Sequence, residues 1–291
     1  MDAIEIHGIT KTFRGKGRAV VEAVKDLTLA IPRGEIFGFL GPNGAGKSTT
    51  IKMLMGLIKP AAGSIRIMGN HADLPLSRMH VGYLPENPSF YDYLCAMEYL
   101  SFVGKTFGMQ ETVMRDRIES NLKLLDLWDA RDRFIRGYSK GMVQRLGLAQ
   151  TLIHDPDVYI LDEPMSGLDP IGRALVKEII LDLKARGKSI FFSTHITSDV
   201  ESICDRVGII VDGSLQRVDQ VGSILIEGII GYHLKVRIPS RNEVIEFDVS
   251  TADLAGTIND VLSSGKEIML IEPNRKNLEA FFLDIVKGKK C

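Results

Sequence analysis

Gly41-Pro42-Asn43-Gly44-Ala45-Gly46-Lys47-Ser48 has the spacing of a phosphate-binding loop, with a glycine at each end of its first six residues and Lys-Ser after them. The apolar run 36–40 before it predicts the buried strand that such a loop leaves, and a helix is expected from about Lys47. The loop N–H groups would converge on a β-phosphate at the positive end of that helix. We therefore predict an ATP site. In this site, Lys47 is expected to contact the β- and γ-phosphates and to act as a catalytic residue. The Ser48 hydroxyl is expected to ligate Mg²⁺, and Thr49 to belong to the binding loop.

The composition limits what the chain can be. Its 291 residues exceed the roughly 100–200 residues of one domain, so a large and a small domain are expected. The net charge of −1 offers no broad basic field, and no nucleic-acid partner is expected. Cys95, Cys204 and Cys291 are far apart and predict neither a disulfide framework nor a metal site, which favours the cytoplasm. No signal peptide is expected, and no apolar run reaches the roughly 18 residues of a membrane span, so any membrane role should be peripheral.

Strand and helix signals alternate through the first 220 residues. Strands are expected at 4–12, 20–31, 63–68, 81–84, 158–161, 189–193 and 207–211, with a helix at 170–186. Asp212-Gly213 predicts a hairpin turn into a strand at 214–218. Between these parts, about 87–154 has a helical pattern and is expected to be a helical insertion. We predict an α/β fold with a mainly parallel sheet and an N-terminal antiparallel β part.

The pattern changes beyond residue 220. Strands at 233–238, 244–249 and 268–271, a helix ending near Gly265 and a last helix predict a small α+β accessory domain over 221–291, after a nucleotide-binding domain over 1–220. The apolar stretch 222–236 is expected to be core. Three roles stay open for the accessory domain: regulation, help in dimerising the cassettes, and cover for an edge of the larger domain. The lysine-rich tail 287–290 could contact anionic lipid, although a solvated terminus is favoured.

Two carboxylates end a predicted strand. Asp162 and Glu163 follow the apolar run 158–161, so both should lie at the carboxyl edge of the sheet, where open α/β sheets bind ligands. Asp162 can hold Mg²⁺, and Glu163 is placed to polarise the water that attacks the γ-phosphate. Taken alone, strand-end acids that cap the next turn are the better interpretation. The phosphate-binding loop upstream reverses that preference.

A third motif, Tyr138-Ser139-Lys140-Gly141-Met142, lies upstream of the carboxylates. With it, the order of motifs over roughly residues 2–220 resembles the nucleotide-binding subunit of ATP-binding cassette (ABC) transporters. The resemblance implies that Ser139 and Gly141, with Lys140 between them, contact the γ-phosphate held by the loop of a second protomer. An ordinary helix N-cap is the alternative. Lys140 and Met142 stand where the family usually has Gly and Gln.

The resemblance assigns two residues near Glu163. His195 matches the switch histidine, which hydrogen-bonds the γ-phosphate and holds Glu163 in place. Asp169 ends the loop Ser166-Gly167-Leu168-Asp169, through which protomers sense each other and near which the nucleotide binds. A plain helix-start turn before Pro170 is the competing interpretation of that loop.

Further residues follow from the same resemblance. Phe13 falls where the family has an aromatic side chain that stacks on adenine; a core Phe is the alternative, and the long stretch 14–18 could shift the register. Glu86, in Gly82-Tyr83-Leu84-Pro85-Glu86, stands where most of the family has Gln, and it can ligate Mg²⁺ or orient water. An aromatic cluster suits either the interface with a transmembrane subunit or the core of the helical insertion: Phe90, Tyr91, Tyr93, Tyr99 and Phe102.

The resemblance implies a function. The chain is expected to hydrolyse ATP to ADP and phosphate and to power transport through separately encoded transmembrane permease subunits, as a peripheral protein on the cytoplasmic face of the cell membrane. Its cassettes should pair as a homodimer or with a related cassette. The motif at 83–86 and the C-terminal extension most resemble the multidrug, antibiotic or sodium exporter branch. One alternative is a soluble ABC ATPase of translation or DNA maintenance, but no second phosphate loop or sustained heptads appear. The other is a regulatory module without turnover, against which Glu163 and His195 argue.

Overall fold

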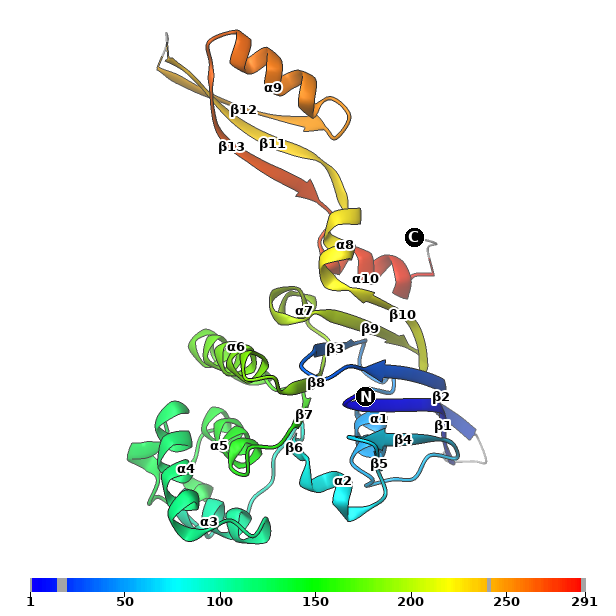
Figure 1. The fold of residues 1–291 in the computed structure, drawn as a ribbon, viewed down its shortest axis with the longest axis vertical. Coiled ribbons are helices and arrows are strands. Elements are labelled where there is room, and N and C mark those ends of the chain that lie inside the picture. Colours follow the sequence, from blue (N-terminus) through cyan, green and yellow to red (C-terminus); the bar gives the residue numbers. More distant parts are fainter. Residues whose placement is uncertain (1, 15–19, 240–241, 289–291) are drawn as a thin grey trace. The chain divides into compact units, whose positions relative to one another are not determined.

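The computed structural model describes residues 2–14, 20–239 and 242–288. The chain divides into two compact units, Met1–Val218 and Asp219–Cys291, a division close to the expected boundary at residue 220 (Figure 1). Residues 15–18 of the long stretch after the first strand lie outside the described residues, as do Cys291 and the tail lysines at 289 and 290.

A six-stranded sheet forms the centre of the first unit, in the order β10-β9-β3-β8-β7-β6. The strands are β3 (Ile36–Leu40), β6 (Val81–Leu84), β7 (Val158–Asp162), β8 (Ser189–Thr194), β9 (Arg206–Val211) and β10 (Ser214–Gln220). β3 pairs in parallel with β8 and β9, and β7 pairs in parallel with β6 and β8. Every residue of β3, β7 and β8 is buried, because a parallel sheet is covered on both faces. The predicted mainly parallel sheet is confirmed.

A second, antiparallel sheet precedes and flanks the first, in the order β2-β1-β4-β5. Its strands are β1 (Ile4–Arg14), β2 (Val20–Ile31), β4 (Ala62–Ile67) and β5 (Asn70–His71). Helix α1 (Lys47–Leu54) contacts β2, β4 and β7, so one apolar core joins both sheets. The two-residue β5 and the five-residue helix α2 (Pro75–Met79) were not predicted, since such short elements leave no periodic pattern.

The helical insertion contains α3 (Ala96–Thr106), α4 (Glu111–Leu124) and α5 (Lys140–Leu152), which gather beside β6 and β7 (Figure 1). The buried residues of α4 are Met114, Ile118 and Leu122, a four-residue spacing that keeps them on one face of the helix. After β7 come α6 (Pro170–Ala185) and α7 (Thr197–Ile203). Among the described residues, no helix combines the length and apolar composition that a membrane crossing needs.

The second unit has a three-stranded antiparallel sheet in the order β12-β11-β13. The strands are β11 (Ile229–Ile238), β12 (Glu243–Ser250) and β13 (Glu267–Arg275); α9 (Leu254–Ser263) packs on this sheet, and α8 (Val221–Glu227) contacts α10 (Leu278–Val286). Leu234, Val236 and Val261 form its buried core. The small α+β part is as predicted. Helix α8 was missed, because the apolar stretch 222–236 was interpreted as one piece of core and a seven-residue helix within it leaves no clear helical period.

Candidate functional site

The phosphate-binding loop connects β3 to α1, and close backbone packing explains its glycines. Gly46 caps α1 with φ +108°, where other residues are strained, and a Cβ there would lie 2.5 Å from the Ala23 carbonyl oxygen. A Cβ at Gly41 would lie 2.5 Å from the Ile210 carbonyl oxygen. The loop therefore wraps between β2 and β9 with no room for side chains at these two positions.

Lys47 is held inside the loop. Its side chain is 7% exposed, and Nζ donates to the carbonyl oxygens of Gly41 at 2.7 Å and Pro42 at 3.3 Å. Nζ also lies 3.6 Å from Oε1 of Glu163. The ammonium is thus positioned by the loop backbone and faces an acid from another part of the chain.

A pocket of about 320 Å³ opens over the loop. Its lining residues are Ala23, Asn43, Gly44, Gly46, Lys47, Ser48, Thr49, Glu86 and Glu163. Two acids distant in sequence thereby reach the loop. Backbone N–H groups with Lys47 suit phosphates, and the Ser48 hydroxyl and Glu86 carboxylate are the oxygen ligands that Mg²⁺ prefers. In the described part of the chain, no three His, Cys, Asp or Glu side chains lie together so that they could hold a metal ion.

Asp162 and Glu163 leave β7 in different ways. Asp162 is 3% exposed, and its Oδ1 accepts a 2.5 Å hydrogen bond from Oγ of Ser193 on β8. Glu163 has φ +49°, unusual for a residue with a side chain, and its N–H donates to the Ser193 carbonyl oxygen at 3.1 Å. This turn takes Glu163 out of the strand direction and brings its carboxylate to Lys47, while Asp162 stays in the sheet. Strained backbone of this kind concentrates at functional sites.

His195 is the second neighbour of Glu163. Its Nδ1 lies 3.0 Å from both oxygens of the Glu163 carboxylate. Because an ionised carboxylate only accepts hydrogen bonds, Nδ1 must carry a proton, and Nε2 remains free to meet a ligand. Glu163 and His195 also line a neighbouring pocket of about 230 Å³, together with Ser166, Gly167 and Leu168. Glu163 therefore belongs to both pockets.

A buried ion-pair cluster that the sequence analysis missed supports this region. Asp199 on α7 is 2% exposed and accepts from Nη2 of Arg173 on α6, at 3.1 and 2.9 Å from its two oxygens. Nζ of Lys177 lies 3.1 Å from Asp199. The cluster ties the helix after Asp169 to the helix after His195. The sequence did contain a signal, because Asp199 lies among the apolar residues on one face of the seven-residue helix α7. A helix of two turns is too short for its buried face to be recognised from the sequence pattern.

Asp169 and Ser139 both cap helices. Oδ1 of Asp169 accepts from the Gly172 N–H at 3.0 Å at the start of α6. Oγ of Ser139 accepts from the Met142 N–H at 3.3 Å at the start of α5. Capping does not exclude a nucleotide contact, because the remaining N–H groups of the first helical turn stay free. Their predicted roles toward the nucleotide remain predictions.

The third motif, residues 138–142, which we call the signature motif, is not brought to the phosphate loop of its own chain. Ser139, Lys140 and Gly141 are absent from the described residues that line the pocket over the loop. The Lys140 side chain instead packs over Gly167, which has φ +73°; a Cβ there would lie 2.8 Å from Lys140 Cε. The signature motif therefore contacts the loop 166–169 of the same chain.

Phe13 lies on β1 opposite Val21 of β2. The Phe13 side chain is 43% exposed, and Nζ of Lys11 lies 5.5 Å from its ring centroid. The core alternative is inconsistent with that exposure. Phe13 is not among the described residues that line the pocket over the loop, although Ala23 of the same sheet is. Adenine stacking by Phe13 therefore remains a prediction.

Comparison with known proteins gives consistent results. Residues 24–166 match the ABC transporter family. An uncharacterized ABC transporter ATP-binding protein of Synechocystis sp. is 50% identical over 67% of this chain, and the match spans 56% of that relative's length. The bacitracin transport ATP-binding protein BcrA of Bacillus licheniformis is 32% identical, over 92% of this chain and 93% of that one. A solved ATP-binding subunit of an ABC transporter superposes with a TM-score of 0.70 at 32% identity, covering 76% of this chain and 91% of that one.

Proposed function

The chain belongs to the family of ABC transporter ATP-binding proteins, and from this premise we propose that it hydrolyses ATP to drive export through separate transmembrane permease subunits. The observation that carries the ATPase assignment is the position of Glu163, 3.6 Å from Lys47 and 3.0 Å from His195. A phosphate held by Lys47 would lie beside the carboxylate that activates water.

The chemistry follows from the charges around Glu163. Bound ATP would replace the Glu163 carboxylate as the partner of Lys47, which frees that carboxylate to accept a proton from the attacking water. His195 orients Glu163 through Nδ1, and with both ring nitrogens protonated it would also donate Nε2–H to the γ-phosphate. Mg²⁺, held by Ser48 and the acids Glu86 and Asp162, would neutralise the charge that develops on the phosphates.

A second cassette completes each site in this proposal. Ser139 and Lys140 are exposed, and Gly141 is half-buried at the N-terminus of α5. A 13-residue helix with free N–H groups favours an anion at that end. Two cassettes that close head to tail would put this end against the γ-phosphate held by the partner's loop, so ATP binding and dimer closure become one coupled equilibrium.

The aromatic cluster separates into two groups that support a membrane partner. Tyr99 is buried, and its ring packs edge-on against Phe90 with centroids 4.9 Å apart. Tyr91, Tyr93 and Phe102 are each more than half exposed and contact one another in a chain. Exposed aromatic rings that gather on one surface are typical of interface cores. We assign Tyr91, Tyr93 and Phe102 to the permease interface, at the inner face of the cell membrane.

A transporter role is supported by similarity over nearly the whole chain, including the second unit, to BcrA, which is named for bacitracin transport. The direction, export, is our expectation from the exporter-like motif at 83–86 and the C-terminal extension. The transported substrate would be bound by the permease, which is a separate chain in this proposal.

The test is co-purification from the native cell. Tagged Glu163→Gln, which should hold ATP without turnover, is isolated with ATP from solubilised membranes and from cytosol, and the retained proteins are identified by mass spectrometry. We expect a multi-span membrane protein, enriched over a Lys47→Ala control that binds ATP more weakly. Retention of ribosomes or DNA-associated proteins, with no membrane protein, would overturn the transporter assignment. A steady-state ATPase assay on the wild-type chain tests turnover separately.

A further inference from the structure

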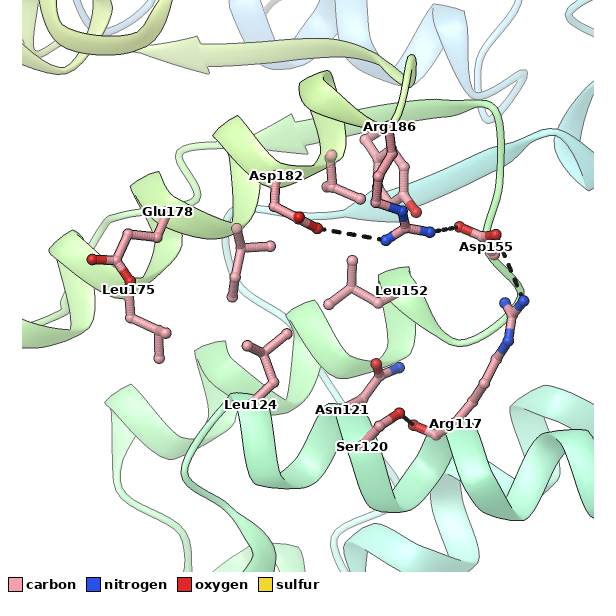
Figure 2. Close-up of a pocket in the computed structure, with 13 residues that line it drawn as sticks. Arg117, Ser120, Asn121, Leu124, Leu152, Asp155, Leu175, Glu178, Asp182 and Arg186 are labelled. Atoms are coloured by element: carbon pink, nitrogen blue, oxygen red, sulfur yellow. Dashed lines mark hydrogen bonds and ion pairs between the residues drawn. The ribbon is translucent and has the colours of Figure 1, made fainter.

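Helix α6 is held at both ends by ion pairs with acids from other parts of the chain. At its C-terminal end, Arg186 pairs with Asp155, which precedes β7, at 2.6 Å (Figure 2). At its N-terminal end, Arg173 pairs with Asp199 of α7 at 2.9 Å. Arg173 and Asp199 also line the pocket of about 230 Å³ that Glu163 and His195 share. The ion pair at the N-terminal end therefore lies beside the residues assigned to hydrolysis.

Two cations neutralise the single carboxylate of Asp199. Asp199 is 2% exposed, so its charge has to be balanced within the protein. Nη2 of Arg173 lies 3.1 and 2.9 Å from its two oxygens, and Nζ of Lys177, one turn further along α6, lies 3.1 Å from Oδ1. One cation is enough to balance one carboxylate. Lys177 can therefore neutralise Asp199 without Arg173, and the second cation needs another explanation.

The position of Arg173 in the chain supplies that explanation. Arg173 is in the first turn of α6, and its backbone N–H donates to the Asp169 carbonyl oxygen at 2.9 Å. Its guanidinium reaches Asp199 in the first turn of α7. One residue thus joins the end of the loop 166–169 to the start of α7. Lys177 is not among the described residues that line the pocket beside His195.

The position of the His195 ring depends on the start of α7. Its side chain is 48% exposed, so surrounding packing constrains it little, and its Nδ1 meets Glu163 at 3.0 Å. Only residues 196–198 separate His195 from Asp199, and the Ile196 N–H donates to Oγ1 of Thr194 at 3.0 Å, which keeps this connection short. A displacement of about 1 Å at a catalytic group can cost about 100-fold in rate. A side chain that fixes α7 therefore controls the contact between His195 and Glu163.

We propose that Arg173 is a positioning residue. By holding Asp199, it fixes the start of α7 and keeps the His195 ring against the Glu163 carboxylate, while Lys177 neutralises Asp199 and keeps α6 and α7 together. The proposal rests on the ATPase function proposed above. It adds to that function a residue that acts through His195.

The test is a double-mutant cycle between Arg173 and His195, measured as steady-state ATP turnover of the full chain with Mg²⁺. Arg173→Met keeps an unbranched side chain and leaves Lys177 to neutralise Asp199. We expect kcat to fall about 10- to 100-fold, with KM for ATP within about twofold of wild type. In the His195→Ala background the same substitution should lower kcat by less than about twofold, because it acts through the missing ring. Equal factors in the two backgrounds, or an unchanged kcat in Arg173→Met, would overturn the proposal.

Arg186→Met is the matched control. It removes an arginine from the other end of the same helix and leaves Arg117 and Lys188 on Asp155, at 3.6 and 3.2 Å. Its kcat should stay within about twofold of wild type. A loss as large as that of Arg173→Met would mean that any weakening of α6 lowers turnover, and it would contradict a specific role for Arg173.

A second variant covers the case in which Arg173→Met does not fold. Asp199→Asn keeps the size of the side chain and releases both cations, which can reach water because Arg173 and Lys177 are 33% and 27% exposed. It should lower kcat as Arg173→Met does, again with little change in KM. A folded Asp199→Asn with wild-type kcat would overturn the proposal.

A readout without turnover separates this proposal from the proposed function. The Nδ1 proton of His195, held by the Glu163 carboxylate, should give an imidazole N–H resonance in the NMR spectrum of the full chain that is missing in His195→Ala. We expect Arg173→Met to lose this resonance, since a ring detached from Glu163 exchanges its proton rapidly with water, and Arg186→Met to keep it. Its retention in Arg173→Met would contradict the positioning role. If the wild-type chain does not hydrolyse ATP but the resonances behave as expected, the ATPase proposal fails and the positioning of His195 by Arg173 stands.

Discussion

The two regions assigned to the nucleotide differ in how the chain holds them. Around the phosphate loop, Lys47, Asp162 and Glu163 are all buried and linked to one another or to neighbouring strands. At the signature motif, Ser139 and Lys140 are exposed; Ser139 caps α5, and the Lys140 side chain packs over Gly167. The side chains around the phosphate loop are held in place by contacts within one chain, whereas the signature motif is an exposed surface that a second protomer would contact. Substitutions in the first should change chemistry or binding in the monomer, and those in the second should act only between protomers.

The largest effect is expected for Glu163→Gln. The amide keeps the size and a contact with His195 but cannot take a proton from water, so turnover should fall about 10²- to 10⁴-fold. ATP affinity should be retained, because the Glu163 carboxylate and the phosphates are both negatively charged and the substitution removes no attraction between them. Phosphate release and nucleotide binding are measured on the same preparation. A turnover within tenfold of wild type would remove Glu163 as the base.

Lys47→Ala should come next. Loss of a charge-assisted contact to the β- and γ-phosphates is expected to weaken ATP binding about 10- to 100-fold, as a hydrogen bond to a charged group is worth about 1.5–3 kcal/mol. Lys52→Ala is the matched control, an exposed lysine on the same helix. The affinities of both variants are measured by equilibrium binding of a fluorescent ATP analogue. If both variants bind as wild type does, the loop does not hold the phosphates through Lys47.

Ser139→Ala tests the signature half-site. We expect unchanged ATP affinity in the dilute monomer and turnover lowered about tenfold at concentrations where cassettes pair. Loss of the cap also costs about 1 kcal/mol of stability, so Ser139→Asn, which can still cap α5, serves as a control. Turnover is followed against protein concentration. Lower ATP affinity in the monomer would show that Ser139 acts within its own chain and would break the contrast between the two regions.

The smallest effect is expected for Lys140→Gly, which restores the residue usual in the family. An exposed ion pair between Lys140 and a bound phosphate would contribute about 0.2–1 kcal/mol, so ATP-dependent pairing of Glu163→Gln cassettes should weaken at most about two- to fivefold. Lys140→Arg should preserve pairing, and high salt should remove the difference. Pairing is measured by sedimentation at several protein concentrations. Tighter pairing in Lys140→Gly would mean that the lysine hinders closure.

Prediction from sequence succeeded where the pattern is local. The strands at 36–40 and 81–84 were predicted with the bounds of β3 and β6, because a buried parallel strand is an unbroken apolar run. Elements of a few residues, such as β5 and α2, were missed for lack of periodicity. The cluster of Arg173, Lys177 and Asp199 was missed for another reason: ion pairs between two helices follow from their packing, which no spacing within either helix reveals.

By itself, the sequence determined the phosphate loop, the order of the motifs, the family and the two-part organisation, because each depends on residue types at fixed short spacing. Only the tertiary structure decided that Glu163 turns out of β7 to stand between Lys47 and His195, and that the signature motif lies away from the phosphate loop of its own chain. The physical reason is that such contacts join residues distant in sequence, and their geometry is set by how the sheet and helices pack.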